Sequence, residues 1–218
     1  MTTRKPAEDR REEILEAACA AILQNGLEAW TTRDVTARLG LSVGILFHYF
    51  ASARALRAAA VARIAERDLA SAFAMEEGLT AAETLSRFLA DVLTDATDDT
   101  WRTWFDAWTV ARDDPAIAEA CTAQMLAWQA RLAALIERGV AEGGMTCADP
   151  AGAARRLLAL IDGLAGQMLP PFSRVTPEEA TADLFALARA EGLLPPGQAP
   201  APQASGSQAP RGQDPGGR

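Results

Sequence analysis

The stretch TTRDVTARLGLSVGILFHYFASARAL, residues 31–56, decides the fold of this chain. Thr31 is followed three positions later by Asp34, a capping-box pattern that predicts the start of a helix. Gly40 provides a stop, and Ser42 can cap a second short helix that ends in an aromatic cluster. Two short helices separated by about three residues, with a glycine between them, have the spacing of a helix-turn-helix.

Caps and stops divide the sequence on both sides of this stretch into helices. Upstream, apolar residues at helical spacing predict a helix over residues 9–24. Downstream, the expected helices cover residues 52–75, 80–96, 99–112, 115–142, 150–167 and 177–191. No segment shows the alternation of a β-strand. The sequence therefore predicts an all-α fold of about nine helices, with a small N-terminal head on a larger helical body.

Three regions follow from this pattern. The head covers residues 8–68 and contains the helix-turn-helix at 31–50, and the helical body covers residues 69–194. Residues 195–218 consist mainly of Pro, Gly, Gln, Ala and Ser without apolar periodicity. Such a composition cannot bury enough surface to offset the entropy of ordering, so we expect a disordered tail.

The formal net charge of −8 argues, taken alone, against nucleic-acid binding, because phosphate contacts need Lys and Arg. The charge is unevenly distributed, however. Residues 1–60 carry eight basic and seven acidic side chains, whereas the rest of the chain carries thirteen basic and twenty-two acidic ones. A weakly basic head on an acidic body can dock head-first on double-stranded DNA.

The second helix of the motif has the features of a recognition helix. Its first turn contains Ser42, Val43 and Gly44, which are small enough to enter a major groove. His48 and Tyr49, at its far end, suit phosphate contacts. The alternative interpretation of this aromatic cluster is a patch of the core.

Four neighbouring residues complete the predicted interface. Arg33 lies in the first turn of the preceding helix and Arg54 at the start of the next, where both are placed to lie over the DNA backbone. Leu46 and Phe50 are expected to pack inward and hold the recognition helix to the head.

The head resembles that of the TetR family of regulators. The matching segments, in order and spacing, are Thr32 to Val35, Leu39 to Ser42 and Gly44 to Phe50, followed by Leu56. The His-Tyr-Phe ending and the Asp-Gly-Leu segment at 162–164 resemble the choline-responsive BetI branch. The resemblance implies a homodimeric repressor that binds a palindromic operator and releases it when a small molecule binds the C-terminal domain.

The resemblance also implies a set of DNA contacts. They are Thr32, Arg33, Ser42, Val43, Gly44, His48 and Tyr49. One position departs from the family pattern, because Ala53 stands where the family commonly has a lysine that meets phosphate. Either Arg54 replaces that lysine, or DNA binding is weaker and less dependent on salt.

Aromatic residues recur at helical spacing in the body. Three tryptophans of one predicted helix share a face, and the next helix adds another. Such a stripe is either core packing or an aromatic box for a quaternary ammonium compound. Asp106 and Asp162 would supply a counter-charge if they point inward. The candidate ligand-binding residues are Trp101, Trp104, Phe105, Trp108, Met125, Trp128 and Met168.

The last two predicted helices carry wide apolar faces. These faces either complete the core of a monomer or pair with a second copy of the chain. The resemblance implies the second alternative, a four-helix dimer interface. The candidate interface residues are Leu157, Leu160, Ile161, Leu164, Leu184 and Leu187.

Other classes of function lack their motifs in this sequence. There is no G-x-S-x-G, P-loop or HExxH pattern, and the single histidine lies in the predicted DNA face. The acid pairs at 98–99 and 113–114 precede helices and are interpreted as caps. We therefore expect no enzymatic activity and no cofactor. A helical scaffold that does not bind DNA remains the alternative.

Three dispersed cysteines with one histidine form no metal-ligand pattern, so we expect free buried thiols and no metal site. The N-terminus lacks an apolar stretch of the signal-peptide kind, and no later run reaches the ~20 apolar residues that span a bilayer. We expect a cytoplasmic protein without membrane contact.

Overall fold

A computed structural model describes residues 7–74, 78–94 and 99–195 of the chain. Within these ranges the regular structure consists of nine helices and contains no strand, which confirms the all-α prediction. The predicted disordered tail, apart from its first residue, lies outside the described residues.

The head is built from three helices, α1 (Ala7–Asn25), α2 (Thr32–Leu39) and α3 (Val43–Leu46). The predicted capping box at the start of α2 is present, because Thr31 and Asp34 exchange side-chain and backbone hydrogen bonds. Gly40 ends α2 at a φ of +64°, a left-handed conformation that favours glycine. Ser42 precedes α3 as expected, but its side chain makes no capping hydrogen bond.

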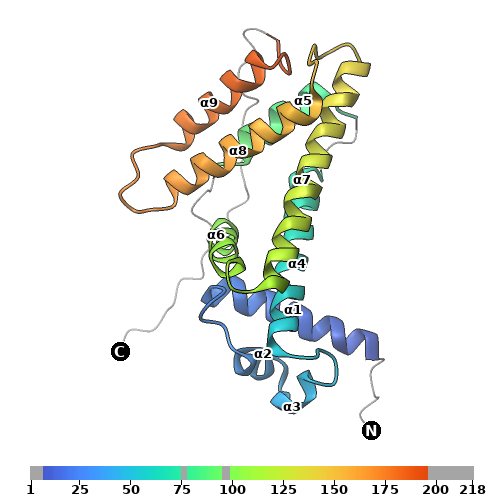
Figure 1. The fold of residues 1–218 in the computed structure, drawn as a ribbon, viewed down its shortest axis with the longest axis vertical. Helices are drawn as coiled ribbons and strands as arrows, with labels where there is room; N and C mark the ends of the chain where they lie inside the picture. The colour runs from blue at the N-terminus through green and yellow to red at the C-terminus, as the bar shows by residue number, and fades with distance from the viewer. Residues whose placement is uncertain (1–6, 75–77, 95–98, 196–218) are drawn as a thin grey trace, which may run out of the picture.

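One long helix, α4 (Ala53–Ala72), leads from the head into the body (Figure 1). It begins at Ser52, whose hydroxyl accepts a hydrogen bond from the backbone of Ala55 at 3.1 Å. Figure 1 shows α2 and α3 at one end of the elongated molecule and α9 towards the other. Because α4 spans the region between them, it is the covalent link between the helix-turn-helix and the body.

The body contains five further helices. Their bounds are α5 (Ala81–Asp91), α6 (Asp99–Ala111), α7 (Pro115–Ala141), α8 (Pro150–Met168) and α9 (Pro177–Ala190). The long helix α7 runs beside α4, whereas α8 and α9 lie together at the far end from α3 (Figure 1). The start of α5 is fixed by a capping box between Thr80 and Glu83, as the sequence pattern predicts.

Two apolar clusters form the core. One lies in the head and the other in the body, and α6 contributes to both. Trp104 and Ala107 of α6 pack in the head cluster, whereas Trp101 and Phe105 pack against the body cluster. Because alternate faces of one helix belong to different cores, α6 joins the head mechanically to the body.

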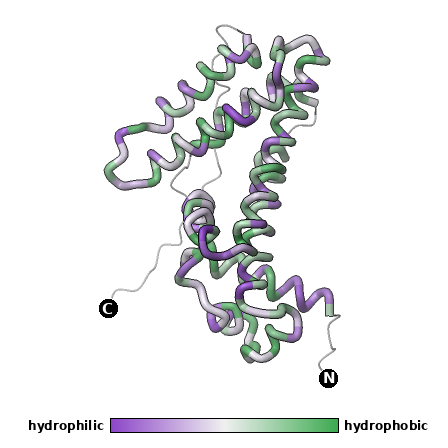
Figure 2. The backbone as a smooth tube through the Cα atoms, in the orientation of Figure 1, coloured by the Kyte–Doolittle hydropathy of each residue, from purple (hydrophilic) through white to green (hydrophobic). Residues whose placement is uncertain are grey.

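Polar and apolar residues are interleaved along the helices (Figure 2). This distribution is typical of helices that bury one face and expose the other. Among the described residues, no helix is long and apolar enough to cross a membrane.

Candidate DNA interface and ligand cavity

The recognition helix presents a small, exposed surface. Ser42, Gly44 and His48 are exposed, while Val43 and Tyr49 are half-buried. A Cβ atom added at Gly44 would meet nothing within 4 Å, so this glycine is not needed for packing inside the head. Its open surroundings leave the backbone accessible to a molecule outside the chain.

The anchoring residues behind this surface lie where the sequence predicts. Leu46 is 1% exposed and Phe50 is 5% exposed, and both belong to the core of the head. In the first turn of α2, Arg33 is exposed and Thr32 is half-buried. These residues and the exposed part of α3 therefore share the end of the molecule that α2 and α3 form (Figure 1).

Arg54 has a protein partner that the sequence did not indicate. Its Nε donates to Oδ1 of Asp114 at 2.6 Å, and Nη2 of Arg57 donates to Oδ2 of the same carboxylate at 2.6 Å. The carboxylate also caps α7, because its Oδ1 accepts the backbone N–H groups of Ala116 and Ile117. A single buried side chain thus joins the first turns of α4 to the start of α7.

Asp114 is held in its ionised form. Burial would raise the pKa of this carboxyl, but the hydrogen bonds from Arg54, Arg57 and two backbone N–H groups outweigh burial and lower the pKa to about 2. The sequence predicted the cap correctly but missed the two arginines. The local signal was the spacing of Arg54 and Arg57, which share one face of a helix without an acidic residue beside them.

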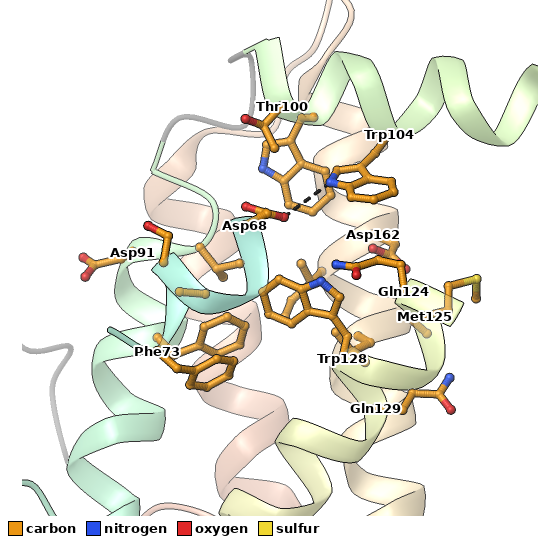
Figure 3. Close-up of a pocket in the computed structure, with 18 of the residues that line it drawn as sticks. Asp68, Phe73, Asp91, Thr100, Trp104, Gln124, Met125, Trp128, Gln129 and Asp162 are labelled. Carbon is orange, nitrogen blue, oxygen red and sulfur yellow. Dashed lines mark hydrogen bonds between the residues drawn. The ribbon is translucent and has the colours of Figure 1, made fainter. Parts of the chain in front are cut away.

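A cavity of about 580 Å³ lies at the other end of α4. It is surrounded by the end of α4 and by α5, α6, α7 and α8 (Figure 3). One wall is a cluster of three rings, in which Phe73 stacks on Phe88 at 5.1 Å between centroids and each lies 5.9 Å from Trp128. The cavity is therefore aromatic and within the size range of small-molecule sites.

Five of the seven predicted ligand-binding residues line this cavity. They are Trp101, Trp104, Trp108, Met125 and Trp128. The stripe of tryptophans is therefore a cavity wall in part, although Trp104 is also 7% exposed and packs in the head core.

The other two, Phe105 and Met168, are not among the residues that line the cavity. The ring of Phe105 packs against the rings of Trp101 and Trp108, at 6.2 and 5.1 Å between centroids, and so supports the cavity wall from behind. The same ring packs beside Gly166 of α8, 3.2 Å from where a Cβ atom would stand. Met168 is 7% exposed and belongs to the body core.

Several lining residues were missed, chiefly Phe73, Phe88 and Gln124. The two phenylalanines come from different helices, and no spacing in the sequence indicates that they meet. Gln124 is 8% exposed and its Nε2 donates to the backbone carbonyl of Ala65 at 3.0 Å. This hydrogen bond ties α7 to α4 beside the cavity.

Asp162 lines the cavity without a charged or hydrogen-bonding partner among the described residues. Its carboxylate lies near Gln124 in Figure 3. Burial raises the pKa of Asp162 to about 6, because the ionised form loses solvation that nothing in the chain replaces. Asp106, the other predicted counter-charge, does not line the cavity. A Cβ atom at Gly26 would be 3.6 Å from its Oδ2, so it lies against the head.

A second hydrogen bond links the cavity to α4. Nε1 of Trp104 donates to Oδ2 of Asp68 at 3.3 Å, as the dashed line in Figure 3 shows. Both residues line the cavity. A ligand that displaces the Trp104 ring would therefore act directly on α4.

The predicted dimer residues fall into two groups. Leu157, Ile161, Leu164 and Leu184 are at most 5% exposed in the monomer and belong to its core. They point towards the other body helices, and their apolar face is used within the chain. Leu160 and Leu187 are half-buried at the edge of that core.

A helix-turn-helix joined by one helix to a body that encloses an aromatic cavity defines a class of regulators that bind both DNA and a small molecule. Residues 14–60 match the family of bacterial regulatory proteins of the tetR type. Residues 81–204 match the C-terminal domain of BetI-type transcriptional repressors. The chain belongs to the TetR family of transcriptional regulators, with an N-terminal DNA-binding domain and a C-terminal ligand-binding domain. The BetI-like resemblance is confirmed.

Individual relatives agree with this assignment. The HTH-type transcriptional regulator PksA of Bacillus subtilis (strain 168) is 30% identical over 161 residues, which cover 72% of this chain and 78% of PksA. A TetR-family regulator from Rhodococcus sp. superposes with a TM-score of 0.72 at 26% identity, covering 85% of this chain and 99% of that one. A transcriptional regulator from Saccharomonospora viridis, solved in complex with choline, superposes with a TM-score of 0.70 at 26% identity. The match covers 84% of this chain and 96% of that one.

Proposed function

We propose that this chain is a transcriptional repressor that binds a palindromic operator as a homodimer and releases it when an organic cation enters the cavity. In this proposal residues 8–68 form the DNA-binding domain and residues 69–194 the domain for ligand binding and dimerisation. The observation that carries the proposal is the course of α4, which starts beside the recognition helix and ends in the cavity wall.

DNA binding is assigned to the exposed end of the head. The small side chains of α3 enter the major groove, and Arg33 lies over the phosphates. His48 and Tyr49 contact the backbone at the far end of the recognition helix. Arg54 contributes less to phosphate binding than a free arginine would, because its Nε already donates a hydrogen bond to Asp114.

The effector is assigned by the chemistry of the cavity. Aromatic faces attract quaternary ammonium groups, and Asp162 offers a carboxylate that has no other partner among the described residues. The choline complex of the Saccharomonospora viridis regulator supports an effector of this class. The burial cost of the Asp162 charge favours a ligand that brings a positive charge.

Release of DNA follows from the two contacts between the cavity and α4. Trp104 donates a hydrogen bond to Asp68, and Gln124 donates one to the backbone carbonyl of Ala65. A cation that rearranges these side chains shifts α4 and with it the head. In a two-fold dimer this changes the distance between the recognition helices, which must match half-sites about one helical turn apart.

Dimerisation is assigned to the outer faces of α8 and α9. Leu160 and Leu187 lie at the edges of these faces, and the exposed positions between them are small, as at Gly163 and Ala186. Small residues allow the helices of two subunits to approach closely. A regulator of this kind acts on DNA in the cytoplasm and needs no enzymatic activity.

The direct test is fluorescence anisotropy with DNA from upstream of the protein's own gene, at two salt concentrations. We expect saturable, salt-sensitive binding to one palindromic segment. His48→Ala should weaken that binding, whereas Glu178→Ala, an exposed position of α9, is the matched control. Folded dimeric protein that binds no segment would overturn the regulator function and favour a scaffold.

A further inference from the structure

The cavity carries positive as well as negative side chains. Half-buried Arg87 of α5 and exposed Arg155 of α8 both line it, and neither makes a hydrogen bond or an ion pair within the described part of the chain. Other arginines of the protein do have carboxylate partners. Arg156, the neighbour of Arg155, donates to both carboxylate oxygens of Glu191, at 2.5 and 2.6 Å.

The two unpaired arginines lie towards one end of the cavity. Arg87 and Arg155 are in the second turns of α5 and α8. The start of α5 is tied to the end of α7, where Oε2 of Glu142 accepts the backbone N–H of Ala81 at 2.8 Å. Helix α8 begins shortly after α7 ends, so both second turns lie near that junction.

Asp162 lies towards the opposite end. It is seven residues after Arg155 on the same face of α8, a separation of about 10 Å along the helix axis. The later part of α8 abuts α6, because Gly166 packs against Phe105. Burial alone raises the pKa of Asp162, with no opposing contribution from an arginine. Neither arginine therefore neutralises the charge of Asp162.

A simple cation would satisfy only one end of this cavity. It would place its charge between Asp162 and the tryptophans, but it would leave two arginines facing the ligand without an acceptor. A guanidinium group binds a carboxylate through paired hydrogen bonds, which is the complement these side chains lack. The volume of about 580 Å³ has room for a ligand longer than choline.

We propose that the effector is an elongated zwitterion, with a quaternary ammonium group at Asp162 and the aromatic rings and a carboxylate held by Arg155 and Arg87. This inference rests on the proposed function, since it extends the cation site of that proposal to a second, anionic site. The length of the ligand is set by the distance between the two charged ends of the cavity.

Isothermal titration calorimetry with a matched series of ligands tests the proposal. The probes are trimethylammonio-acetate, -butanoate, -hexanoate and -octanoate, each compared with the alkyltrimethylammonium ion of the same length that lacks the carboxylate. We expect the longer carboxylates to bind roughly tenfold more tightly than their matched cations. We expect trimethylammonio-acetate to show no such advantage, because it is too short to reach both ends.

Substitutions of the two arginines test whether they bind the carboxylate. Arg155→Gln and Arg87→Gln should each remove most of the carboxylate advantage and leave the affinity for the alkyl cations within about twofold. Arg112→Gln, an exposed arginine outside the cavity, removes the same charge and should preserve the advantage.

Each outcome of the series bears on one of the two proposals. If the cations bind and the carboxylates of every length bind no better, the anionic site is overturned and the cation site stands. If carboxylates are preferred equally in Arg155→Gln, Arg87→Gln and the parent protein, the assignment to these arginines is overturned. If no trimethylammonium compound binds, both the zwitterion proposal and the organic-cation effector of the proposed function are overturned.

Discussion

At the start of α4, Arg54 and Arg57 share one buried carboxylate, whereas around its end the charged side chain of Asp162 has no partner within the described residues. The first arrangement holds the ionised form of Asp114, and its pKa falls to about 2. The second destabilises the ionised form of Asp162, and its pKa rises to about 6. The contrast separates a charge that stabilises the fold from one that we propose to bind a ligand.

The largest effect on stability is expected from removing the carboxylate that Arg54 and Arg57 share at the start of α4. Asp114→Ala leaves two arginines without their carboxylate and removes the cap of α7. Because Arg54 is half exposed, we expect a loss of about 3 kcal/mol in the free energy of unfolding, the lower end of the range for broken buried ion pairs. Urea unfolding at neutral pH measures it. Asp113→Ala, an exposed neighbour, is the control, and equal losses in both variants would contradict the assignment.

The same carboxylate sets a pH dependence at acid pH. Its folded pKa of about 2 lies below the ordinary aspartate value of 3.8, so its contribution is complete above about pH 5 and is lost as the pH falls towards 2. The difference in stability between the parent protein and Asp114→Asn should therefore shrink over that window. A difference that stays constant between pH 4 and pH 2 would mean that ionisation of Asp114 is not responsible.

A second prediction concerns Asp162, whose charge is either paired with a bound cation or removed by substitution. Near neutral pH, Asp162→Asn should lower the affinity for an alkyltrimethylammonium ion about tenfold, because the cation loses its counter-charge. Calorimetry measures the change, with Asp183→Asn on the exposed side of α9 as control. In the parent protein, affinity should also fall about tenfold between pH 7 and pH 5 as Asp162 takes up a proton.

Without ligand, the same substitution should stabilise the protein. The folded pKa of Asp162 is above the ordinary aspartate value of 3.8, so its ionisation lowers stability as the pH rises from about 4 to 6. Asp162→Asn removes that loss, and we expect a gain of about 1 kcal/mol near pH 7. A variant that is less stable than the parent protein would show that the carboxylate has a structural role.

The sequence predicted the helices well because their ends depend on local chemistry. The capping box at Thr31 and the stop at Gly40 are properties of a few adjacent residues. The direction of a side chain depends instead on what packs around the helix. Phe105 and Leu157 fit the predicted periodic faces equally well, yet one faces α8 instead of the cavity and the other is in the monomer core.

Most of the cavity was beyond sequence analysis for a related reason. Phe73 and Phe88 become one wall only after α4 and α5 pack together. Arg87 and Arg155 are ordinary arginines of amphipathic helices until the fold brings both to the cavity. The tryptophans were found because four of them stand close together in a chain with few aromatic residues.

A third prediction concerns the link between cavity and α4. Trp104→Phe keeps an aromatic ring but removes the N–H that donates to Asp68. A hydrogen bond of this kind contributes about 1 kcal/mol, so we expect ligand affinity to change little while the ligand concentration needed for DNA release shifts several-fold. Anisotropy and calorimetry on the same variant separate the two. Trp108 also lines the cavity but donates no hydrogen bond to α4, so Trp108→Phe should shift the concentration for DNA release only in proportion to any change in ligand affinity. The same uncoupled shift in both variants would contradict a specific role for Trp104.

The smallest effect, a change in operator affinity, is expected at the start of α4. Ala53 is exposed beside Arg54, where the family commonly has lysine. Ala53→Lys should tighten operator binding modestly and steepen its salt dependence by about 0.9 in the logarithmic slope for each lysine that meets a phosphate. Ala70→Lys, an exposed position far along α4, is the control. An unchanged slope in Ala53→Lys would place the start of α4 away from the DNA.

In the proposed mechanism, a cation bound at Asp162 changes the position of the head through α4. The decisive measurement is the anisotropy of fluorescent operator DNA during a choline titration of the parent protein and of Asp162→Asn. We predict equal DNA affinity without choline, release from the parent protein, and release from Asp162→Asn only at about tenfold more choline. Release of both proteins at the same choline concentration, or of neither, would contradict coupling between Asp162 and the DNA-binding head.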